Sequence, residues 1–397
     1  MHTPETLQIP LAMLTVFGSA KLMAELFERL RQPAIVGEIL AGVLIGPSVL
    51  GWMSPNELLV ALADLGVMFL LFRVGLEVKS SELMKVGGTA LAVAVLGVIV
   101  PFFMGWVILL AWGEPQVEAI FVGAALVATS VGITAQVLAS KGLLHERASK
   151  IILAAAVIDD VLGLIVLALV SSLARGQVVA LELATTAVMA VGFTVLAAKW
   201  GSKTMRKIVP QVGRRLRVGE AQFALSMVLL FALATLAVYA GVAAIIGAFL
   251  AGMALAESVD RRVHDLAHGV TELLVPFFLA GIGLHFDLKS FLDPGTLWLS
   301  LIILCAAMLS KFLGCGLGAI RLGIRDATRV GLGMAPRGEV GMVVAGLGLS
   351  MGVIPSHIYA VVVFMAVMTT ILAPPLLSLS FRELVKPDRE EEVFRLG

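Results

Sequence analysis

Residues 151–170 read IILAAAVIDDVLGLIVLALV, an apolar run interrupted only by the adjacent aspartates Asp159 and Asp160. About 20 apolar residues in a helix cross a hydrocarbon core of roughly 30 Å. The run therefore predicts a membrane-spanning helix with two carboxylates near its centre. A charge at that depth costs about 2.5–3.5 kcal/mol on insertion scales, and such residues are functional by default. The acidic pair is our first candidate for a functional site.

The rest of the chain is similarly apolar, because 59% of its 397 residues are hydrophobic and only 14% are charged. Soluble globular proteins carry about 25% charged residues. We expect an all-α polytopic membrane protein with 13 transmembrane helices, occupying 1–397 as a single transporter domain. The thirteen apolar segments are 7–28, 34–52, 57–77, 87–112, 117–140, 149–173, 178–200, 220–239, 241–257, 267–285, 296–320, 328–351 and 356–380.

Several classes of function are disfavoured. The net charge of +1 gives no general attraction to nucleic acid. No phosphate-binding loop, cysteine metal cluster or catalytic triad is apparent, so we expect neither an enzyme nor a cofactor. His264 and His268 have a spacing that can hold a metal, but we interpret them as a solvated pair. Cys305 and Cys315 are ten residues apart on one predicted helix, about 15 Å, too far for a disulfide.

The distribution of Lys and Arg predicts the orientation. Outside the apolar segments these residues lie in the loops after odd-numbered segments and in the tail 381–397, and only Arg175 and Lys289 lie on the other side. By the positive-inside rule the side that is rich in Lys and Arg is cytoplasmic. We expect the N-terminus outside, retained as a helix, and a short cytoplasmic C-terminal tail. The basic stretch 200–219 is the one long connection that we predict.

The chain also repeats itself. AIVGEILAG at 34–42 resembles AIIGAFLAG at 244–252, and Val74-Gly75-Leu76 resembles Ile282-Gly283-Leu284. The matching segments are seven apart, an odd number, so the two copies must be inverted. We predict two inverted six-helix repeats, about 7–173 and about 220–380, with a linker helix at about 178–200. Inverted repeats are a common plan of alternating-access carriers.

Three further features belong with the acidic pair. Lys311 lies in the middle of an apolar segment and is the basic residue best placed to pair with a carboxylate. Two segments are expected to be broken, one at Ala128–Thr134 and one at Ala335–Gly341. Proline removes a backbone donor, and Gly, Ser and Thr permit irregular backbone at depth. Interrupted segments at matching positions of two repeats point to a transport site.

Four other charges lie in or near apolar segments, and we interpret them as structural or gating residues: Glu38, Asp64, Arg73 and Glu77. Arg73 and Glu77 have the i,i+4 spacing of an ion pair on a helix.

These motifs resemble those of the bacterial monovalent cation:proton antiporters, in particular the electrogenic Na⁺/H⁺ antiporters of the NapA type with the NhaA fold. The matching pieces are VATSVGITAQV at 127–137, AAVIDDVLGLIVL at 155–167, KFLG at 311–314 and GMAPRGEVGMV at 333–343. Electroneutral relatives have Asn before Asp, where this chain has Asp159. The relatives of the NhaA type have an Asp in the first broken helix, which is absent here.

The resemblance implies an NhaA-type fold with crossed discontinuous helices, and a homodimer in the bacterial inner membrane. Asp160 would bind the cation and the proton, and Asp159 would pair with Lys311. Thr129 and Ser130 would lie near the cation. The residues implied at the crossing of the broken helices are Gly132, Thr134, Pro336, Arg337 and Glu339.

The expected activity is exchange of Na⁺ (or Li⁺) for H⁺ with movement of net charge. One alternative is a K⁺/H⁺ antiporter or potassium efflux system, whose members usually carry a nucleotide-binding domain. Another is a sodium-coupled organic anion symporter, for which only Arg337 is available as an anion-binding group. A membrane-embedded hydrolase that uses the acidic pair is the most distant alternative.

Overall fold

The computed structural model describes residues 5–30, 32–79, 85–174, 180–215, 220–286 and 288–384, and all its regular elements are helices. In the first half these are α1 (Glu5–Arg29), α2 (Ala34–Ile45), α3 (Glu57–Glu77), α5 (Gly87–Trp112), α6 (Gln116–Val127), α7 (Val131–Ser140) and α8 (Arg147–Ala174). Then follow α9 (Ala180–Arg215), α10 (Ala221–Tyr239), α11 (Ala244–Leu255), α12 (Arg261–Leu284), η1 (Leu288–Phe291), α13 (Pro294–Gly318), η2 (Ile320–Leu322), α14 (Ile324–Gly333), α15 (Glu339–Ser350) and α16 (Ser356–Ser380).

The helices have the lengths and composition of a polytopic membrane protein. In the described part of the chain, nine helical stretches are long and apolar enough to cross a membrane, and shorter apolar helices include α2 and α11. Each of the thirteen predicted segments coincides with a helix or with two halves of a broken one. Nine crossings rest on length and composition, and the total of 13 stays a prediction.

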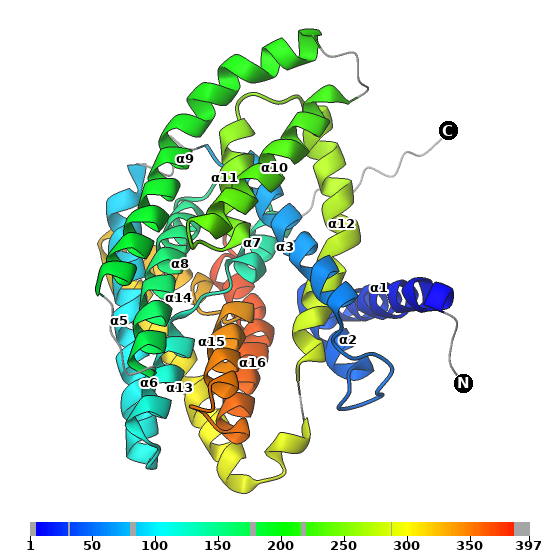
Figure 1. Ribbon diagram of the computed structural model, residues 1–397. Helices are drawn as coiled ribbons and strands as arrows, with labels where there is room; N and C mark the ends of the chain where they lie inside the picture. The colour runs from blue at the N-terminus through cyan, green and yellow to red at the C-terminus, as the bar shows by residue number, and fades with distance from the viewer. Residues whose placement is uncertain are drawn as a thin grey trace.

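The long connection that we predicted at 200–219 is wrong for most of its length, because α9 continues as a helix to Arg215. Seven of the sixteen residues 200–215 are Lys, Arg, Met or Gln, which have high helix propensity, and the helix continues despite Gly201, Pro210 and Gly213. At 36 residues and 1.5 Å per residue, α9 spans about 54 Å, well beyond a hydrocarbon core. Figure 1 shows α9 in green along the outer edge of the molecule.

Most packing occurs within two groups of helices. One group comprises α1 to α3 and α10 to α12, and the other comprises α5 to α8 and α13 to α16. Helix α9 packs on α10 and α11 of the first group and on α8 of the second. In Figure 1 the second group fills the lower left, and α1, α2, α3 and α12 lie to the right.

Glycines bring the helices of the first group into backbone contact. A Cβ at Gly42 of α2 would collide with the carbonyl of Ala280 on α12, and one at Gly283 would collide with α2. Gly75 of α3 and Gly252 of α11 face one another in the same way. Small residues of this kind allow close helix packing in membranes. Two pairs of helices therefore cross at equivalent glycines.

Candidate functional site

Two helices of the second group are interrupted near the middle of the molecule. Helix α6 ends at Val127 and α7 begins at Val131, and helix α14 ends at Gly333 and α15 begins at Glu339. Pro336 in the second break has no backbone N–H to donate, which prevents a continuous helix there. The first break falls inside the stretch expected from the sequence, and the second begins one residue before its expected stretch.

The two breaks lie against one another and satisfy each other's backbone groups. The Ser130 N–H donates to the Pro336 carbonyl at 2.9 Å, and the Thr134 hydroxyl donates to the Gly333 carbonyl at 2.6 Å. A Cβ at Gly338 would lie 2.6 Å from the Ser130 Oγ, so only glycine fits this approach. Irregular backbone at membrane depth requires such partners because lipid offers none.

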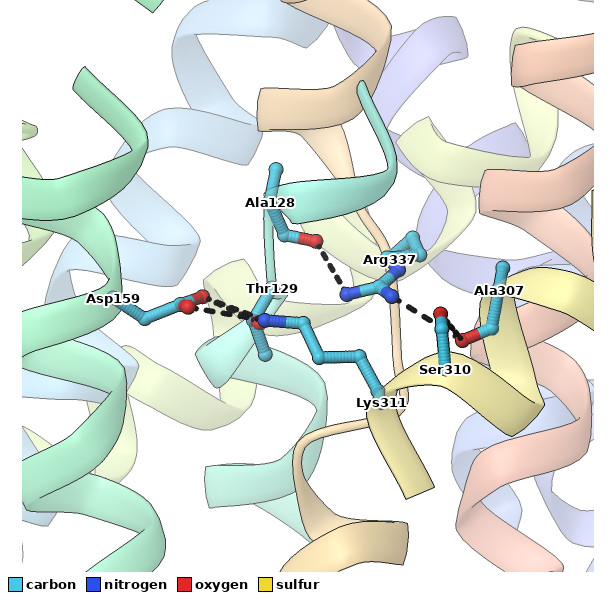
Figure 2. A network of polar contacts seen from close by, with 7 residues as sticks. All are labelled: Ala128, Thr129, Asp159, Ala307, Ser310, Lys311 and Arg337. Atoms are coloured by element: carbon cyan, nitrogen blue, oxygen red, sulfur yellow. Dashed lines mark hydrogen bonds and ion pairs between the residues drawn. The ribbon is translucent and has the colours of Figure 1, made fainter. Parts of the chain in front are cut away.

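Arg337 fills the space between the breaks and is completely buried. Its Nη1 donates to the Ala128 carbonyl at 3.0 Å and its Nη2 to the Ala307 carbonyl at 3.2 Å, as Figure 2 shows. Ala128 directly follows α6, at the helix end where unpaired carbonyls carry partial negative charge. The guanidinium therefore compensates the end of α6, and its own backbone N–H donates to the Thr369 hydroxyl at 3.0 Å.

Asp159 of α8 is held by groups from two other elements. Lys311 Nζ of α13 lies 3.0 Å from Asp159 Oδ1 and 3.1 Å from Oδ2. The Thr129 hydroxyl, in the first break, donates to Oδ2 at 2.6 Å. Both charged side chains are at most 1% exposed, and in Figure 2 they point toward each other across the first break. Removing either partner of such a pair leaves a buried charge uncompensated.

Asp160 follows Asp159 and lies about 100° further around α8, so it meets different surroundings. It is half-buried and lines a cavity of about 50 Å³. Water occupies about 30 Å³ per molecule in the liquid, so the cavity has room for a small cation only after it has lost most of its hydration shell. The other lining residues are Ala124, Ala128, Asp159, Gly163, Leu164, Leu167, Ala243, Val340 and Val344.

An apolar layer lies on the other side of Asp160. Val157 and Leu153 of α8 meet Val131 of α7 and side chains of α3 and α11, and together they enclose no space for water. The cavity residues Gly163 and Leu164 lie toward the C-terminal end of α8, and this layer lies toward its N-terminal end. The cavity of Asp160 thus extends toward the C-terminal end of α8, while the apolar layer toward its N-terminal end leaves no room for water.

The remaining predicted site residues also lie at the crossing. The Ser130 hydroxyl is buried and makes no hydrogen bond within the described residues. Gly132 faces Val67 and Phe278, and a Cβ there would lie 3.0 Å from Val67. Glu339 begins α15, but its side chain falls outside what the structure describes.

Sequence reasoning missed Thr369, which accepts the Arg337 backbone N–H and passes a hydrogen bond to the Ala366 carbonyl at 3.0 Å. Its signal is the Thr369-Thr370 pair within the apolar run of α16. It also missed the Ala307 carbonyl, which no side chain pattern reveals.

Other charges singled out in the sequence form a separate cluster. Glu38 is buried and pairs with Lys21 of α1 at 3.1 Å. Arg73 pairs with Glu272 of α12 at 3.9 Å, so the pairing with Glu77 that we considered is wrong. The i,i+4 spacing places Glu77 within reach, but α12 packs on α3 and offers a carboxylate across the helices.

The two histidines have separate neighbours. His264 Nδ1 lies 3.4 Å from the Asp260 carbonyl, and His268 lies 3.7 Å from Glu272. Within the ranges that the structure describes, no three potential metal ligands gather. Cys305 is exposed and Cys315 is buried, and both are free thiols.

Comparison with known proteins identifies the family. Residues 13–382 match the family described as sodium/hydrogen exchanger, transmembrane. The chain belongs to the sodium/hydrogen exchanger family. It is similar to the Na⁺/H⁺-K⁺ antiporter GerN of Bacillus cereus, with 35% identity over 91% of this chain and 94% of the relative. It is also similar to the high-affinity Na⁺/H⁺ antiporter NhaS3 of Synechocystis, with 32% identity over 96% and 92%.

Solved structures agree on the fold. This exchanger superposes on the sodium proton antiporter MjNhaP1 of Methanocaldococcus jannaschii with a TM-score of 0.72 and 19% identity, covering 96% of this chain and 97% of the other. The family is one of transporters, and the chain is accordingly a multi-pass, all-helical membrane protein. The NhaA-type details of the fold stay predictions.

Proposed function

We propose that this exchanger is an antiporter that moves Na⁺ (or Li⁺) against H⁺, with Asp160 as the carboxylate that the two ions share. The observation that carries the proposal is the division between adjacent residues. Asp159 is neutralised by Lys311 at 3.0 Å, whereas Asp160 lines a small cavity beside the helix crossing. The family and its antiporter relatives support the same activity.

Charge explains why the ions must alternate. With both aspartates ionised and Lys311 protonated, the centre carries a net charge of −1. Moving an uncompensated charge through an apolar barrier is costly. A proton on Asp160 neutralises the centre, and a bound monovalent cation compensates the charge of Asp160; either ligand lets the surrounding helices move. Because both ligands need the same carboxylate, one must leave before the other binds, and the result is exchange.

The surroundings of Asp160 suit a small cation. Thr129 and Ser130 lie in the first break, and the buried Ser130 oxygen has no hydrogen bond in the described residues. Hydroxyl, carbonyl and carboxylate oxygens are the ligands that hard cations prefer. Gly132, Thr134, Pro336 and Arg337 then hold the crossing in shape, with Glu339 at the start of α15. No resident cofactor is required.

Lys311 makes the exchange electrogenic in this proposal. A cation bound at the centre competes with Lys311 for Asp159, and the released ammonium gives up a proton. More protons than cations then move in each cycle. The small separation between Lys311 and Asp159, both fully buried, supports this coupling.

Alternating access requires the apolar layer around Val157 and Leu153 to open when the cavity on the other side closes. The walls of the Asp160 cavity come from both groups of helices, because Ala243 precedes α11 while Val340 belongs to α15. A shift of one group against the other therefore changes access to Asp160. We take the group with α5 to α8 and α13 to α16 as the mobile core domain.

The organisation that we infer is two inverted repeats, about 7–173 and about 220–380, joined by the linker at about 178–200. The matched glycine contacts of α2 with α12 and of α3 with α11 support it. We further propose a homodimer in the bacterial inner membrane, with the N-terminus outside and the C-terminus cytoplasmic, as the positions of Lys and Arg favour.

The principal test is Asp160→Asn in proteoliposomes with an internal pH dye. We expect Na⁺-dependent proton flux to fall to the level of protein-free vesicles, because a neutral amide cannot bind a proton or attract a cation. Thermal stability in detergent should stay near wild type, since the Lys311 pair is intact. Retained sodium-driven flux would refute the role of Asp160.

Lys311→Gln tests the electrogenic part. We expect exchange to continue with less charge moved per cycle, so an imposed membrane potential should change its rate much less than in the wild type. Charge movement on solid-supported membranes measures this directly, with thermal stability as the control for the unpaired Asp159. A variant that moves the wild-type charge would contradict the proposed part of the lysine.

A K⁺/H⁺ antiporter is the second candidate, because the name of the relative GerN includes K⁺. The same dye assay with Na⁺, Li⁺ and K⁺ separates the two. An organic anion symporter is disfavoured, because both terminal nitrogens of Arg337 already donate to carbonyls.

A further inference from the structure

A second, larger cavity lies between the two groups of helices and has no part in the site described so far. It has a volume of about 400 Å³ and is lined by residues of α3, α12, α15 and α16. Its walls are mostly apolar, and Asp64 of α3 is the single carboxylate among them. In the described part of the chain, Asp64 makes no ion pair, and its side chain is exposed to the cavity.

This cavity adjoins the proposed ion site through one turn of α15. Met342 and Val343 line the Asp64 cavity, and Val340 and Val344 on the same turn line the cavity of Asp160. The two cavities therefore lie on different faces of the same stretch of α15, which separates Asp64 from Asp160. The floor of the Asp64 cavity is closed by Val67 and Phe278, which face Gly132 at the crossing.

The internal repeat gives Asp64 a counterpart. Gly283 follows Gly75 by 208 residues, and the same step from Asp64 leads to Glu272 of α12. Glu272 lines a different cavity, of about 820 Å³, where Gln136 and Val137 of α7 also lie. Those two residues precede Met342 and Val343 by 206 residues, so the two cavities have corresponding walls in the two repeats.

The two carboxylates differ in what surrounds them. Glu272 has two cationic neighbours, Lys21 at 3.7 Å and Arg73 at 3.9 Å. The cavity of Asp64 has neither a lysine nor an arginine in its lining. A single negative charge between low-dielectric walls focuses the field and raises the local concentration of cations. Asp64 is thus the carboxylate of the two without a competing lysine or arginine; His285 also lines its cavity but, among the residues that the structure describes, forms no ion pair with it.

We propose that Asp64 collects monovalent cations on the face of the membrane where α3 begins and supplies them to Asp160. The proposal rests on the proposed antiport function. Asp64 acts through the local ion concentration and not as a ligand at the exchange site. Its neutralisation should therefore weaken the apparent affinity for cations presented at that face and leave the turnover number unchanged.

Membrane vesicles of the two opposite polarities test this, because each presents one face to added Na⁺. At low ionic strength, Asp64→Asn should raise the KM for Na⁺ by roughly three- to tenfold in right-side-out vesicles. The kcat should match the wild type. In inverted vesicles the KM should be that of the wild type. About 0.15 M choline chloride should remove most of the difference, because salt screens the field.

Two further variants complete the experiment. Asp64→Glu keeps the charge and should restore the KM. Glu272→Gln removes the carboxylate at the corresponding position of the other repeat, in the other cavity, and should leave the KM in right-side-out vesicles unchanged.

The proposal is overturned if Asp64→Asn leaves that KM unchanged, raises it equally from both faces, or lowers kcat instead. An equal rise with Glu272→Gln would also overturn it, because the effect would then not belong to this cavity. A wild-type protein without cation exchange would instead refute the proposed function, which the vesicle assay reveals before any variant is compared.

Discussion

Both interrupted helices place irregular backbone at the crossing, but different residues stabilise that backbone in each. The break between α6 and α7 consists of Ala128, Thr129 and Ser130 and contains no charge or proline. The break between α14 and α15 is longer and contains Pro336, Arg337 and Gly338. The Arg337 guanidinium binds the carbonyl of Ala128 at 3.0 Å.

The comparison teaches that the second break supplies the charge that the first one lacks. The first break in turn supplies the hydroxyl that holds Asp159, through Thr129 at 2.6 Å. Each break therefore contributes a polar group that the other break does not contain. Changes at the two breaks should therefore fail in different ways, one through lost charge and the other through a lost hydroxyl.

The largest effect is expected from Arg337→Leu. It leaves the Ala128 carbonyl buried without a donor, and it removes the charged donor of the Ala307 carbonyl, which keeps only the Ser310 hydroxyl at 3.2 Å. Each of the two losses costs about 1–3 kcal/mol. We expect a loss of about 2–6 kcal/mol in the free energy of unfolding, with a large fall in melting temperature in detergent and loss of exchange.

Arg325→Leu is the matched control for that variant. Arg325 lies on α14, and its pair with Glu383 at 2.9 Å is exposed. Exposed pairs contribute about 0–1 kcal/mol, so Arg325→Leu should melt near the wild type. Equal losses of stability in the two variants would show that the buried contacts of Arg337 contribute no more to stability than an exposed ion pair.

Thr129→Val should have the next largest effect. It removes the hydroxyl from the Asp159 carboxylate, and hydrogen bonds to charged groups contribute about 1.5–3 kcal/mol. Lys311 still neutralises the charge, so the protein should fold with a lower melting temperature. Thr129→Ser keeps the donor and should recover most of the loss. If serine and valine behave alike, the hydrogen bond is not what matters at this position.

Gly338→Ala should have the smallest effect, because it tests contact and not charge. The new Cβ would lie 2.6 Å from Ser130 Oγ and 2.7 Å from Ser130 Cβ, and overpacking of this kind costs about 1–3 kcal/mol. Ser130→Gly removes both atoms and should recover stability in the double variant. A double-mutant cycle on melting temperature measures the coupling, and additive effects would speak against contact between the breaks.

Much of the architecture is predictable because the bilayer imposes one length on every crossing helix. The thirteen apolar segments coincide with helices for that reason, and Pro336 with its neighbouring glycine indicates where one helix must break. The continuation of α9 to Arg215 escaped prediction because the hydrophobic pattern ends near residue 200, and Gly201, Pro210 and Gly213 gave no signal that the helix continues.

The residues that form the candidate site are predictable from the sequence, but the contacts between them are less so. A buried Lys311 and a buried acidic pair require one another, so chemistry alone brings them together. Which aspartate takes the lysine depends on the rotation of α8, which an apolar sequence on all sides does not define. The partners of Arg337 are mostly carbonyls, and Arg73 selects Glu272 from a neighbouring helix. Contacts of these kinds leave no pattern in the sequence.

The glycine contacts of α2 and α3 also affect how the chain is made. Gly42 packs against the backbone of α12 and Gly75 against that of α11. These partner helices are synthesised some 200 residues later. At about 5–20 residues per second, the ribosome needs roughly 10–40 s to reach them. During that time the first half of the protein sits in the membrane with its closest-packing surfaces facing lipid. We therefore expect correct assembly to require that α2 and α3 make no wrong contacts before α11 and α12 are inserted.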